Sequence, residues 1–332
     1  MKILITGGAG YIGSTIASAC LDAGIEPVIL DDLSKGIAAH TVGRIFFDGD
    51  IADGGLLDRI LDEHPEVFAV IHCAARTVVP ESVADPLGYY DVNVGRTVRM
   101  LQHLRRRGVR RIVFSSSASV YAGDLVGGLH ESAPLAPASP YARTKADVER
   151  ILSDTAASGD LRTLSLRYFN PIGCDPRLRT GPTSPRPSHV LGLLLAARRE
   201  DRDFTITGVD WPTRDGSGLR DFVHVWDLAR AHVAAVEHFD EIVTDEVPAV
   251  VLNVGTGRGT TVRELVDAFV AIAGPLPVNE GTRRPGDVAG GFALVDAAEH
   301  ALRWRAELSI DDAIRDALAW EDRAASETEA QR

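Results

Sequence analysis

The sequence is poor in cysteine and lacks any long hydrophobic run, and each absence excludes a class of protein. The three cysteines are far apart and odd in number, so they predict neither a disulfide framework nor a metal site. Such cysteine usage fits a reducing compartment, and we expect the cytoplasm. No segment is apolar over the length that a bilayer requires, so a membrane location is not expected. The apolar N-terminus is interrupted between Gly7 and Gly13, which favours a first strand over a signal peptide.

Positive charge is also scarce, with 35 Lys and Arg against 47 Asp and Glu and a formal net charge of −12. An acidic chain repels nucleic acid and anionic membranes, so neither is an expected partner. An anionic substrate must then be held by a few local cations. The 332 residues and 45% hydrophobic content fit one large α/β unit or two intimate domains.

The first half of the chain alternates short apolar strands with helices. Continuous apolar strands separated by helices predict a parallel sheet covered on both faces, that is, a doubly wound Rossmann-type α/β fold. The predicted strands are Ile3–Thr6, Pro27–Leu30, Arg44–Asp48, Ala69–His72, Arg111–Ser115 and Thr163–Arg167. The predicted helices lie near Ile12–Ala23, Leu56–Glu63, Tyr89–Arg107 and Pro140–Ser158.

The composition changes after Asn170, which suggests a domain division. Residues 1–170 are predicted to form the dinucleotide-binding domain, and residues 171–322 mainly a smaller substrate-binding lobe. Pro171–Pro187 is rich in proline, glycine and arginine and predicts a loop over a cleft. A strand at Val250–Val254, within residues 250–255, is expected to return to the main sheet, and residues 323–332 to form a frayed polar tail.

A glycine-rich segment follows the first strand and opens a helix. Gly7, Gly10 and Gly13 allow a tight turn and close approach of the backbone to a pyrophosphate, which the helix N-terminus binds through free N–H groups. Asp31 ends the second strand, where a carboxylate accepts hydrogen bonds from a ribose 2′-hydroxyl and repels a 2′-phosphate. These residues therefore predict NAD rather than NADP; the alternative is a purely structural turn. Asp50 is a candidate for the adenine amino group or, alternatively, a helix N-cap before Ile51.

Serine, tyrosine and lysine residues form a second candidate constellation. Ser115 and Ser117 lie at the end of a predicted strand, and Tyr141 and Lys145 are spaced i and i+4 on the helix that follows. A phenol has a pKa near 10, and a nearby ammonium together with a positive nicotinamide ring favours the phenolate. We therefore expect Tyr141 to act as the catalytic acid/base, with Lys145 lowering its pKa and Ser117 orienting the proton. The alternative is three unrelated residues: an interfacial tyrosine, a solvated lysine and a serine-rich strand end.

These motifs resemble the extended short-chain dehydrogenase/reductase family, and within it the UDP-glucose 4-epimerases. The resemblance runs from Met1 to about Trp320 and rests on Gly7–Gly13, Phe114–Tyr121, Ser139–Lys145, Leu166–Pro171, Trp211–Gly216, Gly218–Val225 and Arg283–Asp287. It implies an NAD-dependent isomerase of carbohydrate and galactose metabolism that inverts C4 of a UDP-hexose through a 4-keto intermediate. It also implies a homodimer joined by a four-helix bundle, from helices near Tyr89–Arg107 and Pro140–Ser158.

The resemblance assigns roles to further residues. The implied cofactor-binding residues are Gly7, Gly10, Tyr11, Ile12, Gly13, Asp31, Asp32, Ser34, Asp50, Ile51, Cys73, Ala74, Ala75, Asn93, Ser115, Tyr141, Lys145 and Tyr168. The implied substrate-binding residues are Ser117, Tyr141, Phe169, Asn170, Ser188, Thr205, Thr207, Arg220, Arg284, Asp287 and Gly291. Arginine suits phosphate recognition, although Arg220 and Arg284 could instead form surface ion pairs. Tyr168 and Phe169 could equally be plain core residues.

Several positions depart from the family pattern. Thr77 stands where a lysine is frequent, Phe222 replaces a frequent tyrosine, and Pro187-Ser188 replaces a pair of asparagines. Gly291 replaces a bulky residue that walls the sugar pocket in related epimerases, which predicts room for N-acetyl sugars unless a neighbouring loop fills the space.

Two groups of alternative functions remain open: other nucleotide-sugar enzymes of the same family, and a non-catalytic protein of the same fold. A dehydratase or decarboxylase of the same family needs a carboxylate beside the serine motif, where this chain has Ala118-Ser119. A UDP-uronate epimerase differs only in the sugar it accepts. A non-catalytic NAD-sensing regulator shares the fold, but such proteins typically lose the Tyr/Lys pair that this chain keeps.

Overall fold

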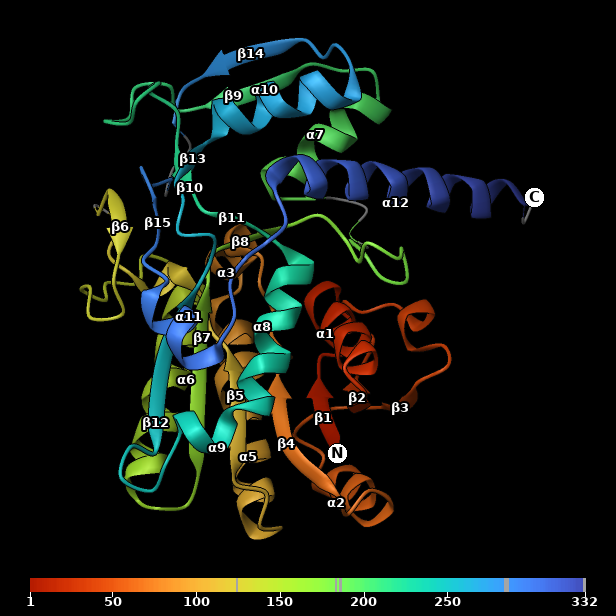
Figure 1. The fold of residues 1–332 in the computed structure, drawn as a ribbon, viewed down its shortest axis with the longest axis vertical. Coiled ribbons are helices and arrows are strands. Elements are labelled where there is room, and N and C mark those ends of the chain that lie inside the picture. Colours follow the sequence, from red (N-terminus) through yellow and green to blue (C-terminus); the bar gives the residue numbers. More distant parts are fainter. Residues whose placement is uncertain (124, 183, 185–186, 284–286, 331–332) are drawn as a thin grey trace.

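The protein is seen here as a computed structural model that describes residues 1–123, 125–182, 184, 187–283 and 287–330. A large parallel sheet carries the first part of the chain, and a smaller group of strands and helices lies at one end of it (Figure 1). Among the described helices, none combines the length and the apolarity that a membrane span requires.

The large sheet has seven strands in the order β12-β7-β5-β4-β1-β2-β3, and all neighbouring pairs are parallel. Its strands are β1 (Lys2–Thr6), β2 (Glu26–Asp31), β3 (Ile45–Asp48), β4 (Val67–His72), β5 (Arg111–Ser115), β7 (Arg162–Tyr168) and β12 (Ala249–Val254). The strand order reverses between β1 and β4, where doubly wound sheets bind ligands at the carboxyl ends of their strands. The Rossmann-type prediction is confirmed, and so is the return of the strand near residues 250–255.

Alternate residues of each strand face two separate cores. Ile3 and Ile5 contribute to one, and Leu4 between them contributes to the other. The first core is covered by α1 (Tyr11–Asp22), α8 (Val225–Glu237), α9 (Phe239–Ile242) and α11 (Asp296–Leu302). The second is covered by α2 (Gly54–Glu63), α5 (Thr97–Arg106) and α6 (Pro140–Ala157). Because both faces are buried, the strands need apolar residues throughout, which explains their continuous hydrophobic pattern.

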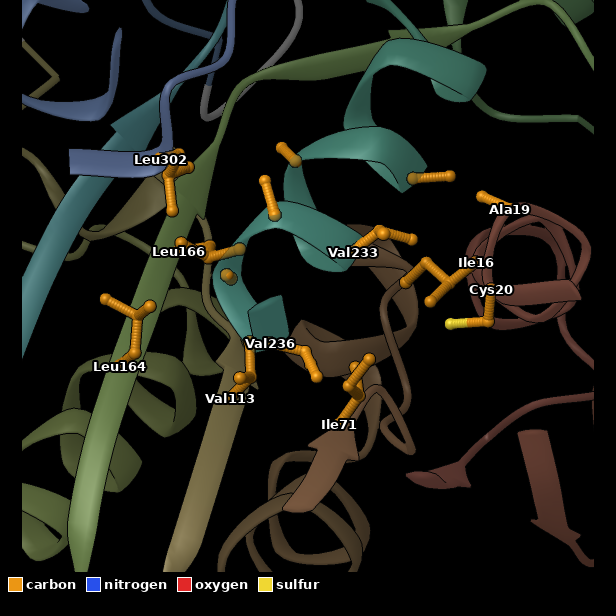
Figure 2. Close-up of a cluster of buried hydrophobic side chains, with 14 of the residues drawn as sticks. Ile16, Ala19, Cys20, Ile71, Val113, Leu164, Leu166, Val233, Val236 and Leu302 are labelled. Atoms are coloured by element: carbon orange, nitrogen blue, oxygen red, sulfur yellow. The ribbon is translucent and has the colours of Figure 1, made fainter. Parts of the chain in front are cut away.

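Helix α8 packs beside α1 on the same face of the large sheet. In Figure 2, Val233 and Val236 of α8 project toward Ile16 and Cys20 of α1 and toward Ile71 of β4. The helix belongs to the second half of the sequence, so residues 225–237 complete the core of the first half.

The helix predicted over Tyr89–Arg107 is divided into segments. It consists of α4 (Pro86–Tyr90), a π-helical stretch η2 (Asp91–Arg96) and α5, and a further helix α3 (Val79–Ala84) precedes it. Proline in the first turn of both α3 and α4 marks their starts. The sequence periodicity indicated one helix because a π-helical stretch interrupts the 3.6-residue repeat without ending the helix.

A smaller lobe packs around its own core, in which Phe204, Phe222 and Phe269 are buried. It contains α7 (Val190–Arg199), β9 (Phe204–Thr207), α10 (Val262–Ala273), β14 (Val278–Gly281) and α12 (Ile310–Ala330). Short strand pairs link it to the sheet: β8 (Asn170–Ile172) with β11 (Phe222–His224), β10 (Leu219–Arg220) with β13 (Thr260–Thr261), and β6 (Gly127–Leu129) with β15 (Gly291–Ala293). The short helical turns are η1 (Ala38–Thr41) and η3 (Ala118–Val120).

Two details differ from the predicted domain outline. Helices α8, α9 and α11 return to the large sheet although they fall within residues 171–322. Helix α12 continues to Ala330, where a frayed tail was predicted from residue 323, and the alanine and glutamate residues of this stretch favour helix.

Candidate functional site

The glycine turn between β1 and α1 is built for close backbone approach. Gly7 has φ of 71°, and a Cβ there would lie 2.6 Å from the backbone nitrogen of Ala74. A Cβ on Gly13 would lie 2.2 Å from the carbonyl oxygen of Gly7. Gly10 is the N-cap of α1 and has no side chain to occupy the helix N-terminus, so the first N–H groups of α1 remain available to an anion. This turn therefore fits a dinucleotide pyrophosphate.

Asp31 at the end of β2 is anchored next to that turn. Its carboxylate accepts hydrogen bonds from the backbone N–H groups of Ala9 at 3.0 Å and Leu33 at 2.8 Å. It is buried, and burial raises its pKa against the lowering effect of these two hydrogen bonds. The neighbouring Asp32 accepts from the backbone and hydroxyl of Ser34 at 3.0 and 2.5 Å at the surface.

Asp50 is not the N-cap of the following helix. It accepts from the backbone N–H of Ala52 at 2.8 Å and from the guanidinium of Arg96 at 2.6 Å, while Asp53 caps α2. Ile51 beside it is buried. The N-cap alternative for Asp50 is therefore wrong, and an adenine contact stays a prediction.

Asn93 lies in the π-helical stretch and connects two elements of the predicted site. Its side chain donates to the carbonyl of Arg76 at 2.9 Å and to Thr144 of α6 at 3.0 Å, and it accepts from the backbone N–H of Arg76 at 2.8 Å. It thereby fixes the loop after β4, which begins with Cys73, Ala74 and Ala75, against the helix that carries Tyr141.

Tyr141 and Lys145 are both buried in the first turns of α6. The helix begins at Pro140, and Ser139 caps it by accepting from the backbone N–H of Ala142 at 3.1 Å. The Lys145 ammonium donates to the carbonyl of Ser115 at 2.8 Å. Burial lowers the pKa of Lys145 to about 8.

The electrostatics of Tyr141 differ from the expectation. Burial has the largest effect and raises its pKa, and hydrogen bonding with Ser117 lowers the pKa only in part. The neutral phenol is therefore favoured, because burial outweighs the effect of the hydrogen bond with Ser117. The sequence spacing could not indicate this, since it carries no information on solvent access.

A buried ion pair beside the serine motif is a site feature that sequence reasoning missed. Glu149 and Arg167 are paired at 2.6 Å with side chains 7% and 5% exposed, and Glu149 also accepts from the hydroxyl of Ser116. Arg167 donates further to the hydroxyl of Tyr121 at 3.1 Å. Glu149 follows Lys145 by four residues and therefore lies on the same helix face. This spacing is the sequence feature that could have indicated a role for Glu149 in the site.

The predicted substrate residues fall into two sets. In the first, Arg220 of β10 donates to the carbonyls of Leu219 at 2.6 Å and Ala289 at 3.1 Å. Burial lowers its pKa, and the Asp287 carboxylate raises it. Asn170 of β8 joins this set through its backbone N–H, which donates to the carbonyl of Asp221 at 2.9 Å.

The second set lies on the smaller lobe. Thr205 and Thr207 are two residues apart on β9 and so share a face, and Ser188 precedes His189, the N-cap of α7. Tyr168 and Phe169 are both 8% exposed and belong to different hydrophobic clusters. Arg284 lies outside the described residues.

Gly291 does not open a pocket in the way the sequence suggested. It pairs with Gly127 in the parallel β15–β6 ladder, and a Cβ would lie 2.6 Å from the carbonyl oxygen of Gly127 and 3.3 Å from the Leu129 side chain. β6 therefore fills the space toward which a side chain would point, which is the alternative left open by the sequence, and acceptance of N-acetyl sugars stays a prediction.

Asp221 is a second residue that sequence reasoning did not single out. It is fully buried, and its carboxylate accepts from Thr256 N–H at 2.8 Å, Thr256 hydroxyl at 2.7 Å, Gly257 N–H at 3.2 Å and Ala293 N–H at 3.1 Å. It thereby holds β10 and β15 against the loop after β12 and supports the Arg220 set. The adjacent Phe222 is a core residue of the smaller lobe.

The parallel sheet, the glycine turn at its switch point and the anchored Asp31 define a dinucleotide-binding protein of the Rossmann class. The chain belongs to the NAD-dependent epimerase/dehydratase family, whose sequence profile matches residues 3–255. It is 39% identical over 324 residues to a UDP-glucose 4-epimerase of Azospirillum brasilense, covering 96% of this chain and 92% of that protein. It is 37% identical over 334 residues to a UDP-glucose 4-epimerase of Bacillus subtilis, covering 97% of each.

Solved structures agree with this assignment. A crystal structure of a UDP-glucose-4-epimerase from Stenotrophomonas maltophila, with bound NAD and formylated UDP-arabinopyranose, superimposes with a TM-score of 0.92. The two sequences are 36% identical, and the superposition covers 99% of each chain.

Acid should destabilise the fold through three buried histidines. Burial lowers the pKa of His40 and His232 to about 4 and that of His72 to about 3, whereas the ordinary value is 6.5. The unfolded chain then binds more protons between these values, so the free energy of unfolding should fall as the pH drops below about 6.5, by roughly 1.4 kcal/mol per unit for each histidine that stays neutral. Urea unfolding at a series of pH values measures this slope. The slope should be shallower in His40→Gln and unchanged in the control His130→Gln, which alters an exposed ring; equal slopes in all three proteins would contradict the assignment.

Proposed function

We propose that this protein catalyses the NAD-dependent inversion of C4 of a UDP-hexose, interconverting UDP-glucose and UDP-galactose through a 4-keto intermediate. The observation that carries the proposal is the burial of Tyr141 and Lys145, one helical turn apart, beside Ser117 at the carboxyl end of β5. The names of the relatives support the same activity.

The cofactor site rests on the glycine turn and on Asp31. The N–H groups at the start of α1 bind the pyrophosphate, and Asp31 accepts from the adenosine ribose. When bound, NAD supplies the hydride acceptor and donor at C4. Lys145 is held by the Ser115 carbonyl and places a positive charge in the same buried region.

Tyr141 takes the proton from the C4 hydroxyl oxygen and later returns it to the same oxygen; the inversion at C4 comes from return of the hydride, which bound NADH would supply, to the opposite face of that carbon. Burial favours its neutral phenol, so its base form depends on positive charge in the site, from Lys145 and the oxidised nicotinamide ring. Ser117 hydrogen-bonds with the phenol and orients its proton.

The nucleotide part of the substrate is assigned to the smaller lobe and its edge. Arg220 binds the diphosphate, Asp287 the uridine ribose, and Thr205 and Thr207 lie along the uracil. The guanidinium of Arg220 already contacts carbonyl oxygens, so it is oriented before a phosphate arrives. β6 fills the space beyond Gly291, and the relative rates on UDP-glucose and UDP-N-acetylglucosamine decide whether the sugar site admits an acetamido group.

The dehydratase alternative lacks a free carboxylate among the described residues next to the serine motif. Ala118 and Ser119 occupy η3, and Glu149, the acidic side chain that contacts Ser116, is also paired with Arg167. Rates measured on a panel of UDP-sugars, including UDP-uronic acids, decide which sugar the protein accepts.

Tyr141→Phe should lower turnover by at least about 100-fold while NAD still binds, because only the proton acceptor is lost. The measurement is the rate of UDP-galactose formation together with the absorbance of the bound cofactor. Tyr90→Phe changes a tyrosine of α4 and should retain the parent rate. Epimerisation by Tyr141→Phe at the parent rate would overturn the catalytic assignment.

Asp31→Ala should narrow the preference for NAD over NADP, because the carboxylate that repels a 2′-phosphate is removed. Dissociation constants for the two cofactors, measured by calorimetry, give the preference. Asp48→Ala is the matched control, since it removes an exposed carboxylate paired in register with Asp31. A parent protein that binds NADP more tightly, or an equal effect of both substitutions, would rule out this role.

The homodimer and the cytoplasmic location complete the proposal. Val83 of α3 and Leu87 of α4 are 65% and 82% exposed, and both helices pack beside α6, which the resemblance places in the dimer bundle. The three cysteines are free thiols, which a reducing compartment would preserve.

Leu87→Asp should convert the dimer into a monomer, because it places a charge in the apolar interface. Light scattering of the purified protein measures the mass. Leu21→Asp is the control, since Leu21 is 46% exposed on α1. A monomeric parent protein would refute the dimer.

A further inference from the structure

His232 is a buried histidine that is not among the predicted site residues. It lies on α8 beneath the end of β5 and is fully buried. Its Nδ1 is 2.9 Å from the carbonyl oxygen of Leu228, and its Nε2 is 3.0 Å from the hydroxyl oxygen of Ser115. A carbonyl can only accept, so Nδ1 carries the proton and Nε2 of the neutral ring is an acceptor.

This tautomer fixes the direction of the neighbouring hydrogen bonds. The Ser115 hydroxyl must donate to His232, which leaves its oxygen free to accept. The Sγ of Cys73 lies 3.1 Å from that oxygen, and burial raises the thiol pKa to about 11, so Cys73 is the donor of this pair. Ser115 therefore has one defined rotamer, held from α8 on one side and from the loop after β4 on the other.

The same residue supports the predicted catalytic lysine through its backbone. The Lys145 ammonium donates to the Ser115 carbonyl at 2.8 Å and lies 4.8 Å from the centre of the Phe114 ring. The carbonyl favours the charged ammonium in a region where burial opposes it. The position of the end of β5 therefore affects the charge on Lys145.

We propose that His232 is a positioning residue for Lys145. By accepting a hydrogen bond from the Ser115 hydroxyl, it holds the end of β5 so that the Ser115 carbonyl faces the ammonium. The groups that face Lys145 from other elements are His72 of β4 and Cys73 after it, and Glu149 and Tyr141 lie on its own helix. His72 is neutral at pH 7 because burial lowers its pKa to about 3. The role of His232 in catalysis rests on the proposed function; its effect on Lys145 does not.

The chain offers a direct readout because it has only three lysines, Lys2, Lys35 and Lys145. In a Lys2→Arg, Lys35→Arg background, Lys145 is the single lysine, and NMR of labelled lysine follows its titration without any activity measurement. This background is the reference protein for all of the following comparisons.

Two substitutions remove the hydrogen bond between His232 and Ser115 from opposite sides. His232→Phe keeps a ring of similar size and removes the acceptor, and Ser115→Ala removes the donor while leaving the carbonyl in place. Both should lower the pKa of Lys145 by at least about half a unit, because the ammonium loses a well-placed acceptor in a site that stays dry. His232→Gln places an amide oxygen near the position of Nε2 and should restore most of the pKa. His103→Phe, the same change in another buried histidine, should leave it unchanged.

The activity of the same proteins tests the catalytic consequence. We expect His232→Phe and Ser115→Ala to lower kcat about 10-fold with little change in KM, and to move the alkaline decline in rate to lower pH. An unchanged or raised Lys145 pKa in both variants overturns the positioning role, and Ser115→Ala decides alone if His232→Phe does not fold. If the reference protein epimerises no UDP-sugar, the proposed function fails, while the pKa comparison still decides the role of His232.

Discussion

The packing of α8 against both α1 and the large sheet is the contact on which the rest of the structure depends. It buries Val233 and Val236 against the core formed by strands from the first half of the chain (Figure 2). It also carries His232 to the end of β5. At its start, the fully buried Asp227 accepts from the backbone N–H groups of Glu307 at 2.9 Å and Leu308 at 2.7 Å. One helix therefore fixes the sheet, the site and the segment that leads to α12 in a single arrangement.

Burial shifts the pKa values of Tyr141 and Lys145 in opposite directions. It raises the pKa of Tyr141 and lowers that of Lys145, because it disfavours the charged form of each. Burial thus keeps Tyr141 neutral until further positive charge arrives with a cofactor, whereas Lys145, with a pKa of about 8, stays mostly charged at pH 7. The protein supplies position, low polarity and the charge of Lys145, and a bound cofactor adds the remaining positive charge.

Buried polar groups in this region are compensated by several partners. Asp221 has four donors, and the Glu149–Arg167 pair is completed by Ser116 and Tyr121. A buried charge without such partners would cost several kcal/mol, so these networks restrict the loops around the site to one geometry. Gly290 is part of the same tightly packed region. Its φ is 88°, and a Cβ there would lie 2.1 Å from the Arg220 guanidinium, so a side chain does not fit at this position.

The sequence alone determined the features that depend on neighbours along the chain. Apolar strand periodicity predicted the sheet, the glycines marked the turn before α1, and the i, i+4 spacing placed Tyr141 and Lys145 on one helix face. Only the tertiary structure decided what depends on residues distant in sequence. It brought His232 to Ser115 and β6 against Gly291, and it set the direction of the Tyr141 pKa. The physical reason is that solvent access and long-range contacts arise from packing, which local periodicity and spacing do not encode.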